Sequence, residues 1–572
     1  MARISQSPPP TPGASDINLL AWLATCVSVF AFLFYYRQGE TLLYGDAIAH
    51  INIARRVFDS KTPGLLQLGT VWLPLPHLLM IPFIVSTEMW RRGAGGSIPS
   101  MAGYVFAVIG VFRLARTSLS HSAQPDRYAR FAAWTAAIIF AANPNLIYMQ
   151  STAMGETLYL AFFIWAVVYF ADWTRGLNAL TKSGLCLAAA CLTRYDGWFM
   201  AATMMIAAIS ISLRQRRGDS YPKDEQKGGR AALQGRSSGN QTRRALAPAK
   251  FILIAAAAPV LWLAYNAIVY RNPLEFANGP YSAKAIEKRT QTAGNPGHPG
   301  GGNPALATLY FLKSAEGNLA QNEWLQRVWI LLACAALVVL TFRIWGRMAG
   351  TLSPATVPLL FLAASIPFYA FSIAYGGVPI FIPNWWPFTH YNVRYGLQLL
   401  PAFAIAGAVL VYVALRAGTI NYRVRLATVF LISALVAISY AGIWQSTPIC
   451  LKEAQVNMRT RNQLQGEVAK WIEKLPGDST LLMYVGDHVG ALERSAFPLK
   501  HTINEGNHRV WRQPADAEGL WERALADPAK YADYVLAFEG DPVWQASHGK
   551  HLHELIELHV TGQPRAVLYA AR

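Results

Sequence analysis

An acid and a histidine follow the first long apolar run of the chain, in the segment TLLYGDAIAHINIARRVFDS. Asp46 and His50 are four residues apart, so a helix places them one turn apart on the same side. A carboxylate in this place has the chemistry of a general base, but Asp is also favoured at helix starts, where it caps the first turn. Apolar residues recur here at helical spacing, at Ala47, Ile51, Ala54 and Phe58. This stripe predicts a helix that lies in a membrane interface.

Two further segments place charges beside apolar runs. Glu156 is the single charged residue of NPNLIYMQSTAMGETLYL, and an acid at the start of a helix is stabilised by the helix dipole whether or not it has a function. Arg194 and Asp196 occur in LTRYDGW, between two short apolar runs. They are explained either by a structural ion pair or by a functional site, and both explanations stay open.

A fourth segment, THYNVRYGLQLLP, places Arg394 at the start of an apolar run, with Tyr391 nearby. An arginine at a membrane boundary can extend its charged end to water. Its planar guanidinium also suits bidentate binding of a phosphate. We favour phosphate binding here.

The composition shows which elements must position these residues. Of 572 residues, 53% are hydrophobic and 14% are charged, against about 25% charged in a typical soluble domain. The net charge of +18 would suit a nucleic-acid binder if the basic residues lined one face, but they occur in short tracts between apolar runs. The five cysteines form no CxxC pair, which argues against a zinc site or a disulfide framework. The sequence therefore predicts a polytopic membrane protein.

Eleven apolar runs predict membrane-spanning helices. They cover roughly residues 18–36, 98–115, 130–143, 157–173, 182–193, 198–213, 251–270, 328–342, 354–376, 394–415 and 426–446. A further apolar stretch, 71–86, contains three prolines, so we expect it to be re-entrant or interfacial. With these eleven spans, Lys and Arg gather on one side, including ten between Arg214 and Lys250. The positive-inside rule then places residues 1–17 in the cytoplasm and the C-terminus outside.

The segments between and after the spans differ in character. The first run, which follows a polar tail, is expected to be a retained anchor. Residues 37–97 form the first outside loop, 214–250 a disordered basic cytoplasmic loop, and 271–325 a long flexible outside loop of the kind that forms lids. From 451 to 572 the composition becomes that of an ordinary soluble protein, which predicts a small extracytoplasmic α/β domain.

Together these segments resemble the GT-C superfamily of membrane glycosyltransferases, which use polyprenyl-phosphate-linked sugars. The resemblance is closest to the bacterial branch of protein O-mannosyltransferases and aminoarabinose transferases. It is carried, in order, by Asp46 on a juxtamembrane helix, LPLPHLL, NPNLIYMQS with GE, LTRYDGW, YRNPLEFANGPYSAK and NVRYGLQLLP. It covers nearly the whole chain.

The resemblance implies a role for each candidate residue. Asp46 matches the carboxylate that deprotonates the acceptor, and Glu156 the second acid, which orients the acceptor or, in some members, a metal. Arg394 matches the position that holds the donor phosphate. The residues Arg194, Arg271 and Lys284 are further candidates for that negative charge, and His50, Asp196 and Tyr391 are further polar candidates. Where many members have a second acid after the first, this chain has Ala47.

The implied function is inverting transfer of a hexosyl or pentosyl group to an extracytoplasmic hydroxyl or amine, on a protein, lipid or glycan. The implied location is a bacterial inner membrane, with no nucleic-acid partner. No organic cofactor is implied, and a divalent metal stays open. Two other classes also stay open, namely an inner-membrane transporter of lipids or glycans, and a membrane-anchored scaffold that acts through 451–572.

Overall fold

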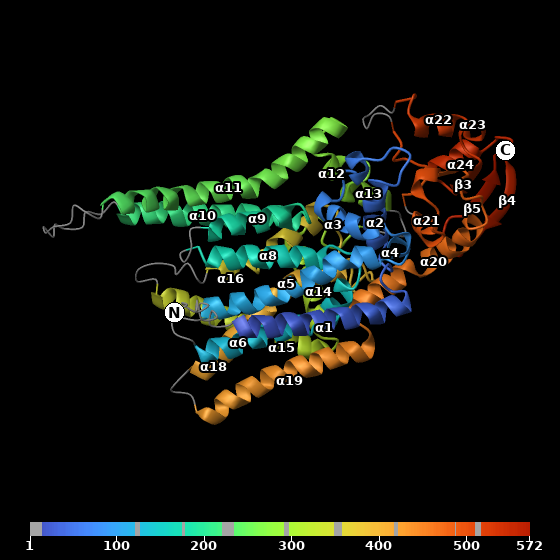
Figure 1. Cartoon of the computed structure of the whole chain (residues 1–572). Helices are drawn as coiled ribbons and strands as arrows, with labels where there is room; N and C mark the ends of the chain where they lie inside the picture. Colours follow the sequence, from blue (N-terminus) through green and yellow to red (C-terminus); the bar gives the residue numbers. More distant parts are fainter. Residues whose placement is uncertain are drawn as a thin grey trace, which may run out of the picture.

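Long helices run side by side through most of the molecule, and a small β-sheet lies at one end of this bundle (Figure 1). The computed structural model describes residues 14–119, 126–173, 178–219, 234–290, 297–347, 357–416, 421–486, 488–508 and 516–571. The helical membrane architecture predicted from the sequence is confirmed, as is the sheet-containing C-terminal region.

Eight segments of the described chain are long and apolar enough to cross a membrane. They are built on α1 (Ala14–Gln38), α5 (Ala94–Leu119), α10 (Asp196–Asp219), α11 (Gln234–Tyr270), α15 (Glu323–Arg347), α16 (Val357–Phe361) with α17 (Ser365–Tyr375), α18 (Leu400–Arg416) and α19 (Tyr422–Ser446). The other three predicted spans fall on shorter apolar helices, α6 (Arg127–Ala141), α8 (Glu156–Ala171) and α9 (Ala179–Cys191). Helix α6 continues through a 64° bend into α7 (Pro144–Gln150).

The proline-containing stretch 71–86 forms α3 (Pro74–Ile84), a helix of 11 residues. At 1.5 Å per residue it is about 16 Å long, roughly half the thickness of the hydrocarbon core. It packs against α2 (Gly45–Arg56) and α5. A re-entrant or interfacial position stays the prediction for this segment.

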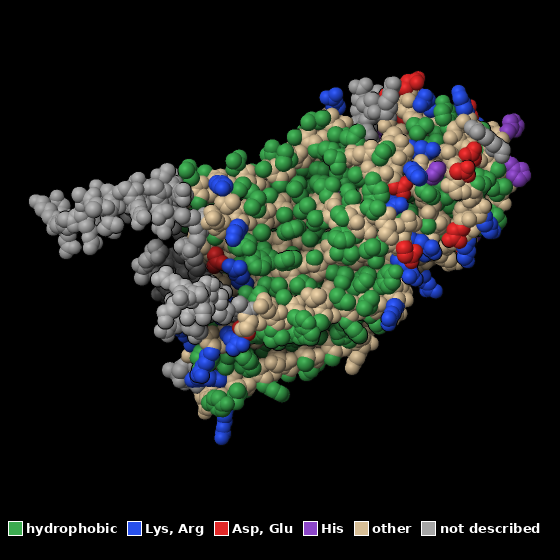
Figure 2. Space-filling view, viewed as in Figure 1, with side chains coloured by type: hydrophobic (Ala, Val, Ile, Leu, Met, Phe, Trp, Pro, Cys, Tyr) green, Lys and Arg blue, Asp and Glu red, His purple; other side chains and the backbone are tan. Residues whose placement is uncertain are grey.

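Hydrophobic side chains cover the middle of the bundle, whereas Lys, Arg, Asp and Glu gather toward its two ends (Figure 2). The described helix ends that border the predicted cytoplasmic connections, such as the end of α5 and the starts of α6 and α19, lie at the end of the bundle where α1 begins (Figure 1). Of the predicted basic loop 214–250, residues 220–233 lie outside the described residues, and α10 and α11 extend into the rest. Residues 1–13 also lie outside them.

The predicted flexible loop 271–325 contains more structure than expected. Beside the short α12 (Glu275–Asn278) and α13 (Ala283–Thr290), it holds the 16-residue helix α14 (Pro304–Leu319). The Asn303 side chain caps α14 by accepting a hydrogen bond from the Leu306 N–H, and an apolar stripe is buried at Ala307, Phe311, Ala315 and Leu319. This stripe packs α14 into the bundle, so this helix is part of the core; residues 291–296 lie outside the described chain.

The C-terminal region begins with α20 (Ile449–Ile472) and contains a five-stranded sheet with the order β2-β1-β3-β5-β4. Its strands are β1 (Leu481–Met483), β2 (Thr502–Ile503), β3 (Tyr534–Phe538), β4 (His553–Leu558) and β5 (Ala566–Ala570). Strand β1 is parallel to β2 and β3, whereas β5 is antiparallel to β3 and β4. Its short helices are α21 (Gly490–Arg494), η3 (Leu499–His501), α22 (Leu520–Ala526), α23 (Pro528–Tyr531) and α24 (Pro542–Ser547).

Helix α2 lies inside the protein and not flat on a membrane interface, which corrects the prediction for this segment. Its apolar stripe, including Ala47, Ile51 and Ala54, is fully buried. On another side, Asn52 donates a hydrogen bond to Glu493 of α21 at 3.0 Å. Helix α2 packs mainly against α3, with further contacts to α5 and to η3 of the C-terminal region, so protein and not lipid or water covers it. The N-terminal and C-terminal parts of the chain therefore position α2 together.

This interface makes stability depend on pH. Burial raises the pKa of Glu493 to about 8, so the folded protein binds the proton more tightly than the unfolded chain does. The stabilisation is complete below the unfolded pKa of about 4.5 and is lost as pH rises through about 8. We expect the unfolding temperature in detergent to fall as the pH rises from about 5 to about 8, and to fall less in Glu493→Gln. Parallel pH profiles of the two proteins would contradict this assignment.

Candidate active site

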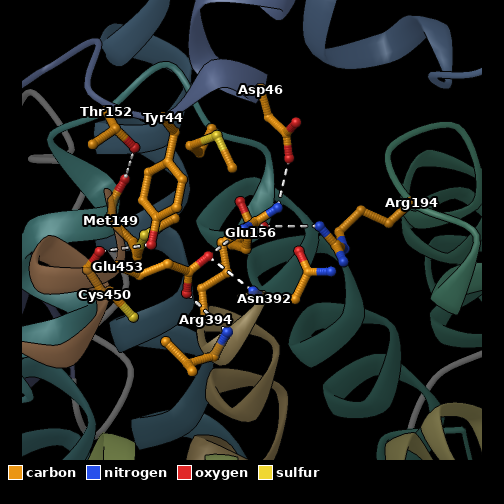
Figure 3. A network of polar contacts seen from close by, with 12 residues as sticks. Tyr44, Asp46, Met149, Thr152, Glu156, Arg194, Asn392, Arg394, Cys450 and Glu453 are labelled. Carbon is orange, nitrogen blue, oxygen red and sulfur yellow. Dashed lines mark hydrogen bonds and ion pairs between the residues drawn. The ribbon is translucent and has the colours of Figure 1, made fainter. Parts of the chain in front are cut away.

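The guanidinium of Arg394 is bonded to three carboxylates that come from three distant parts of the chain (Figure 3). Its Nη2 bonds Asp46 Oδ2 at 2.5 Å, its Nη1 bonds Glu453 Oε1 at 2.7 Å and its Nε bonds Glu156 Oε1 at 3.1 Å. The Arg394 side chain is 5% exposed. Three of the residues predicted from the sequence, Asp46, Glu156 and Arg394, thus meet at one point, together with one that was not predicted.

Two aromatic rings hold the same guanidinium. The Arg394 Cζ lies 4.9 Å from the centre of the Tyr44 ring and 4.9 Å from that of Tyr395, within the range of cation–π attraction. The Tyr44 hydroxyl donates a hydrogen bond to the Cys450 carbonyl at 2.7 Å. The plane of the guanidinium is therefore fixed independently of its ion pairs.

The backbone before Arg394 is fixed by Glu453, which projects from α20. The N–H groups of Asn392 and Val393 donate to the two Glu453 oxygens at 3.0 and 2.8 Å. Asn392 has φ 56°, a left-handed conformation that Asn tolerates better than most residues, and its side chain donates to the Pro379 carbonyl. Glu453 thus holds both the backbone and the side chain at the start of η2 (Val393–Leu399).

Glu156 links Arg394 to a second arginine. Its Oε1 accepts from Arg194 Nη1 at 3.0 Å. Arg194 also lies 3.4 Å from Asp196 Oδ2 and donates to the Tyr369 hydroxyl, which in turn donates to Asp196 at 2.7 Å. The second oxygen of Glu156 is buried, and no hydrogen-bond partner for it lies within the described chain. One buried acceptor atom of the site is therefore without a hydrogen-bond partner among the described residues.

Charge and exposure distinguish the four carboxylates of this network. Asp46, Glu156, Asp196 and Glu453 carry four negative charges against two positive charges on Arg194 and Arg394. The side chains of Glu156 and Glu453 are each 1% exposed and that of Asp196 is 7% exposed, whereas that of Asp46 is 40% exposed. Asp46 is the member of this network that water and solutes reach.

The bond to Arg394 bears on the two roles considered for Asp46. It is the second residue of α2, and no side chain caps this helix at its first residue. In the described chain the Asp46 carboxylate is bonded to Arg394, not to a backbone N–H of α2. Helix capping therefore does not account for this acid.

His50 faces a second histidine and is not bonded to Asp46. Its Nδ1 lies 2.8 Å from His77 Nε2 of α3, and both rings are buried. Burial lowers the pKa of both side chains, so the pair is neutral at neutral pH. A neutral imidazole pair beside the carboxylates adds no positive charge to the site.

The remaining predicted residues lie outside the network. Arg271 and Lys284 are exposed, and no ion pair or hydrogen bond joins them to its carboxylates in the part of the chain that the structure describes. Tyr391 is half-exposed and pairs its backbone with Phe381; the negative charge of Asp46 contributes to raising its pKa to about 12, after burial. Tyr391 thus lines the approach to Asp46.

The described residues do not fit a divalent metal. Across the ranges that the structure describes, no three His, Cys, Asp or Glu side chains are grouped so as to hold an ion. Asp46 and Glu156 each direct an oxygen to a guanidinium, which leaves no pair of free carboxylates facing one point. No chemical step is assigned to a metal here.

Sequence reasoning missed Glu453, Tyr369 and His77. Glu453 lies three residues beyond the boundary drawn at 450, in an amphipathic helix assigned to the soluble domain. The available signal was an acidic residue on an amphipathic helix, because an acid that becomes buried on such a helix needs a cation beside it. His77 lies in LPLPHLL, a segment that was singled out for its prolines and not for its histidine.

Comparisons with known proteins identify solved structures with a similar fold. No protein-family model and no curated protein matches the sequence. Among solved structures, the chain is similar to ArnT from Cupriavidus metallidurans bound to undecaprenyl phosphate, with TM-score 0.50 and 13% identity over 96% of this chain and 97% of that one. The apo ArnT structure gives 0.48 and 14%, over 95% and 98%. An Archaeoglobus fulgidus oligosaccharyltransferase gives 0.44 and 14%, over 91% and 68%. The first match shows that the chain shares the fold of that structure.

Proposed function

We propose that this chain, which has the fold of ArnT, is an inverting membrane glycosyltransferase. It takes a hexosyl or pentosyl group from a polyprenyl-phosphate-linked donor and transfers it to a hydroxyl or amine of a protein, lipid or glycan outside the cytoplasm. The observation that carries the proposal is the contact between Asp46, a reachable carboxylate, and Arg394, a buried guanidinium. One supplies a base and the other a cation, and they meet at the end of the bundle covered by the C-terminal region (Figure 1).

The reaction needs these two functions and little else. The acceptor oxygen or nitrogen attacks the anomeric carbon of the sugar from the face opposite the phosphate, and its proton passes to an Asp46 oxygen. The bond from the anomeric carbon to the phosphate oxygen breaks, and polyprenyl phosphate leaves with the bonding electrons. General base catalysis contributes about 10²–10⁴-fold, and cations placed at the departing phosphate stabilise the charge that develops on it.

The other residues of the network have supporting roles in this proposal. Arg194 adds a second positive charge on the far side of Glu156. Glu156 accepts hydrogen bonds from both guanidiniums through Oε1 and so positions them relative to each other. Arg271 and Lys284 are exposed and are proposed only as part of the entry path of an anionic lipid.

The proposed orientation follows from charge. The described helix ends that carry Arg116, Arg127, Arg416 and Arg423 lie at the end of the bundle away from the site, so the positive-inside rule places that end, where α1 begins, in the cytoplasm. The site and the C-terminal region then face the periplasm or its equivalent, in the inner membrane of a bacterium. A lipid carrier diffuses to such a site within the membrane.

A donor panel tests the proposal. Purified protein in detergent is given polyprenyl phosphates that carry different hexoses and pentoses, with crude envelope as the acceptor source, and released polyprenyl phosphate is measured. We expect release from one donor class, dependent on envelope. Binding without release from any donor would point to the transporter class, and full complementation by residues 451–572 alone would point to the scaffold.

A further inference from the structure

We infer that Asp46 and the donor phosphate compete for the Arg394 guanidinium, so that donor binding itself releases Asp46 to act as the base. The inference rests on the proposed function and adds a binding order to it. Without the donor, Asp46 Oδ2 is held by Arg394 Nη2 at 2.5 Å. While this ion pair lasts, Oδ2 is occupied and the carboxylate is held against Arg394.

Access to the guanidinium is one reason for this inference. Glu156 and Glu453, which bond the Nε and Nη1 atoms, are each 1% exposed. Tyr44 and Tyr395 lie against the guanidinium. The remaining bonded nitrogen, Nη2, faces Asp46, whose side chain is 40% exposed. A phosphate that reaches Arg394 from outside therefore arrives where Asp46 sits.

The ease of displacement differs among the three carboxylates. Glu453 accepts from two backbone N–H groups as well as from Arg394, and Glu156 Oε1 accepts from both arginines. Within the described chain, Asp46 has the single bond to Arg394. Removing Glu156 or Glu453 would strand a buried charge, whereas Asp46 can turn toward solvent at little cost.

The balance of charged groups in the network also supports the displacement of Asp46. The network holds two more carboxylates than guanidiniums, so adding a phosphate increases repulsion unless one carboxylate moves away. Displacement of Asp46 leaves Arg394 bonded to Glu156 and Glu453 on one side and to the phosphate on the other. The displaced carboxylate stays on α2, next to the phosphate and hence near the anomeric carbon. The donor thus binds first, and the base becomes free only when there is a donor to react with.

The binding of undecaprenyl phosphate to the purified full-length protein tests this inference. Undecaprenyl phosphate carries the phosphate and lacks the sugar, so no turnover complicates the measurement. Asp46→Asn removes the charge and keeps the shape of the competitor, and we expect it to bind the lipid about tenfold or more tightly than the wild type, since one charged partner of Arg394 is gone. Asp46→Ala, measured in parallel, should also bind more tightly.

The matched control is Glu323→Gln. Glu323 has a similar exposure of 50% and lies near Lys313, not Arg394, so the substitution removes one negative charge without removing the competitor. We expect it to bind undecaprenyl phosphate like the wild type. Equal tightening in the control would overturn the inference, because bulk charge would then explain the effect.

The two proposals fail in distinguishable ways. If both Asp46 variants bind undecaprenyl phosphate no more tightly than the wild type, the competition is refuted, whatever the donor panel shows. If both bind more tightly and no donor in the panel is turned over, the competition for Arg394 stands and the transfer reaction is refuted. Monodisperse gel-filtration profiles for both variants establish that each affinity belongs to a folded protein.

Discussion

Replacing Asp46 by Asn lowers turnover by about 10²–10⁴-fold, the contribution of a general base. The variant keeps the size and polarity of the side chain and loses the ability to accept a proton. Because Asp46 is partly exposed and has one bonded partner in the described network, the fold tolerates the change. The rate of polyprenyl phosphate release, measured at saturating donor, checks the expectation.

The same variant is expected to separate binding from chemistry. Its turnover falls while its affinity for undecaprenyl phosphate rises, a combination that loss of structure does not produce. Glu323→Gln, which has a similar exposure, should keep wild-type turnover. If Asp46→Asn retained more than about a tenth of wild-type turnover, Asp46 would not be the base.

Replacing Arg394 by Gln is expected to lower the free energy of unfolding by about 3–5 kcal/mol, the usual cost of removing one partner from a buried ionic network. Glu156 and Glu453 are each 1% exposed and would be left without their shared cation. Arg394→Lys is expected to recover little, because an ammonium group cannot form the three directed bonds of the guanidinium fork. Thermal or denaturant unfolding in detergent measures both variants.

Arg565 provides the control for this prediction. It also bonds two carboxylates, Glu539 and Glu557, but all three side chains are more than two-fifths exposed. Solvent screens such pairs, so Arg565→Gln should leave the unfolding temperature almost unchanged. Equal losses of stability in Arg394→Gln and Arg565→Gln would contradict the view that the Arg394 network stabilises the fold because it is buried.

The spans and five members of the network could be predicted from the sequence because their signals are local. Apolar runs of helical length mark the spans, and charges beside such runs mark Asp46, Glu156, Arg194, Asp196 and Arg394. Proline content predicted that 71–86 is not a span, and the segment forms a helix of 11 residues. The residue type alone states whether a side chain can act as a base or as a cation, so both candidates could be proposed before the structure showed their contact.

Features that depend on contacts between distant segments could not be predicted in this way. Glu453 lies 59 residues after Arg394 in the chain, and no local pattern states that α20 folds back onto η2. The stripe of α2 predicts an apolar neighbour without saying whether it is lipid or protein. In the same way, α14 was read as loop because the Gly- and Pro-rich stretch before it dominated the composition of 271–325.

Transfer of a sugar from the lipid carrier is tested most directly with a doubly labelled donor. Proteoliposomes that contain the wild-type protein receive a polyprenyl-phosphate sugar with one label on the sugar and another on the lipid, together with acceptor. The account predicts that the labels separate, with the sugar label on the acceptor and the lipid label in free polyprenyl phosphate, in equal amounts. If both labels stayed together and moved to the opposite leaflet, the protein would be a transporter and the account would be wrong.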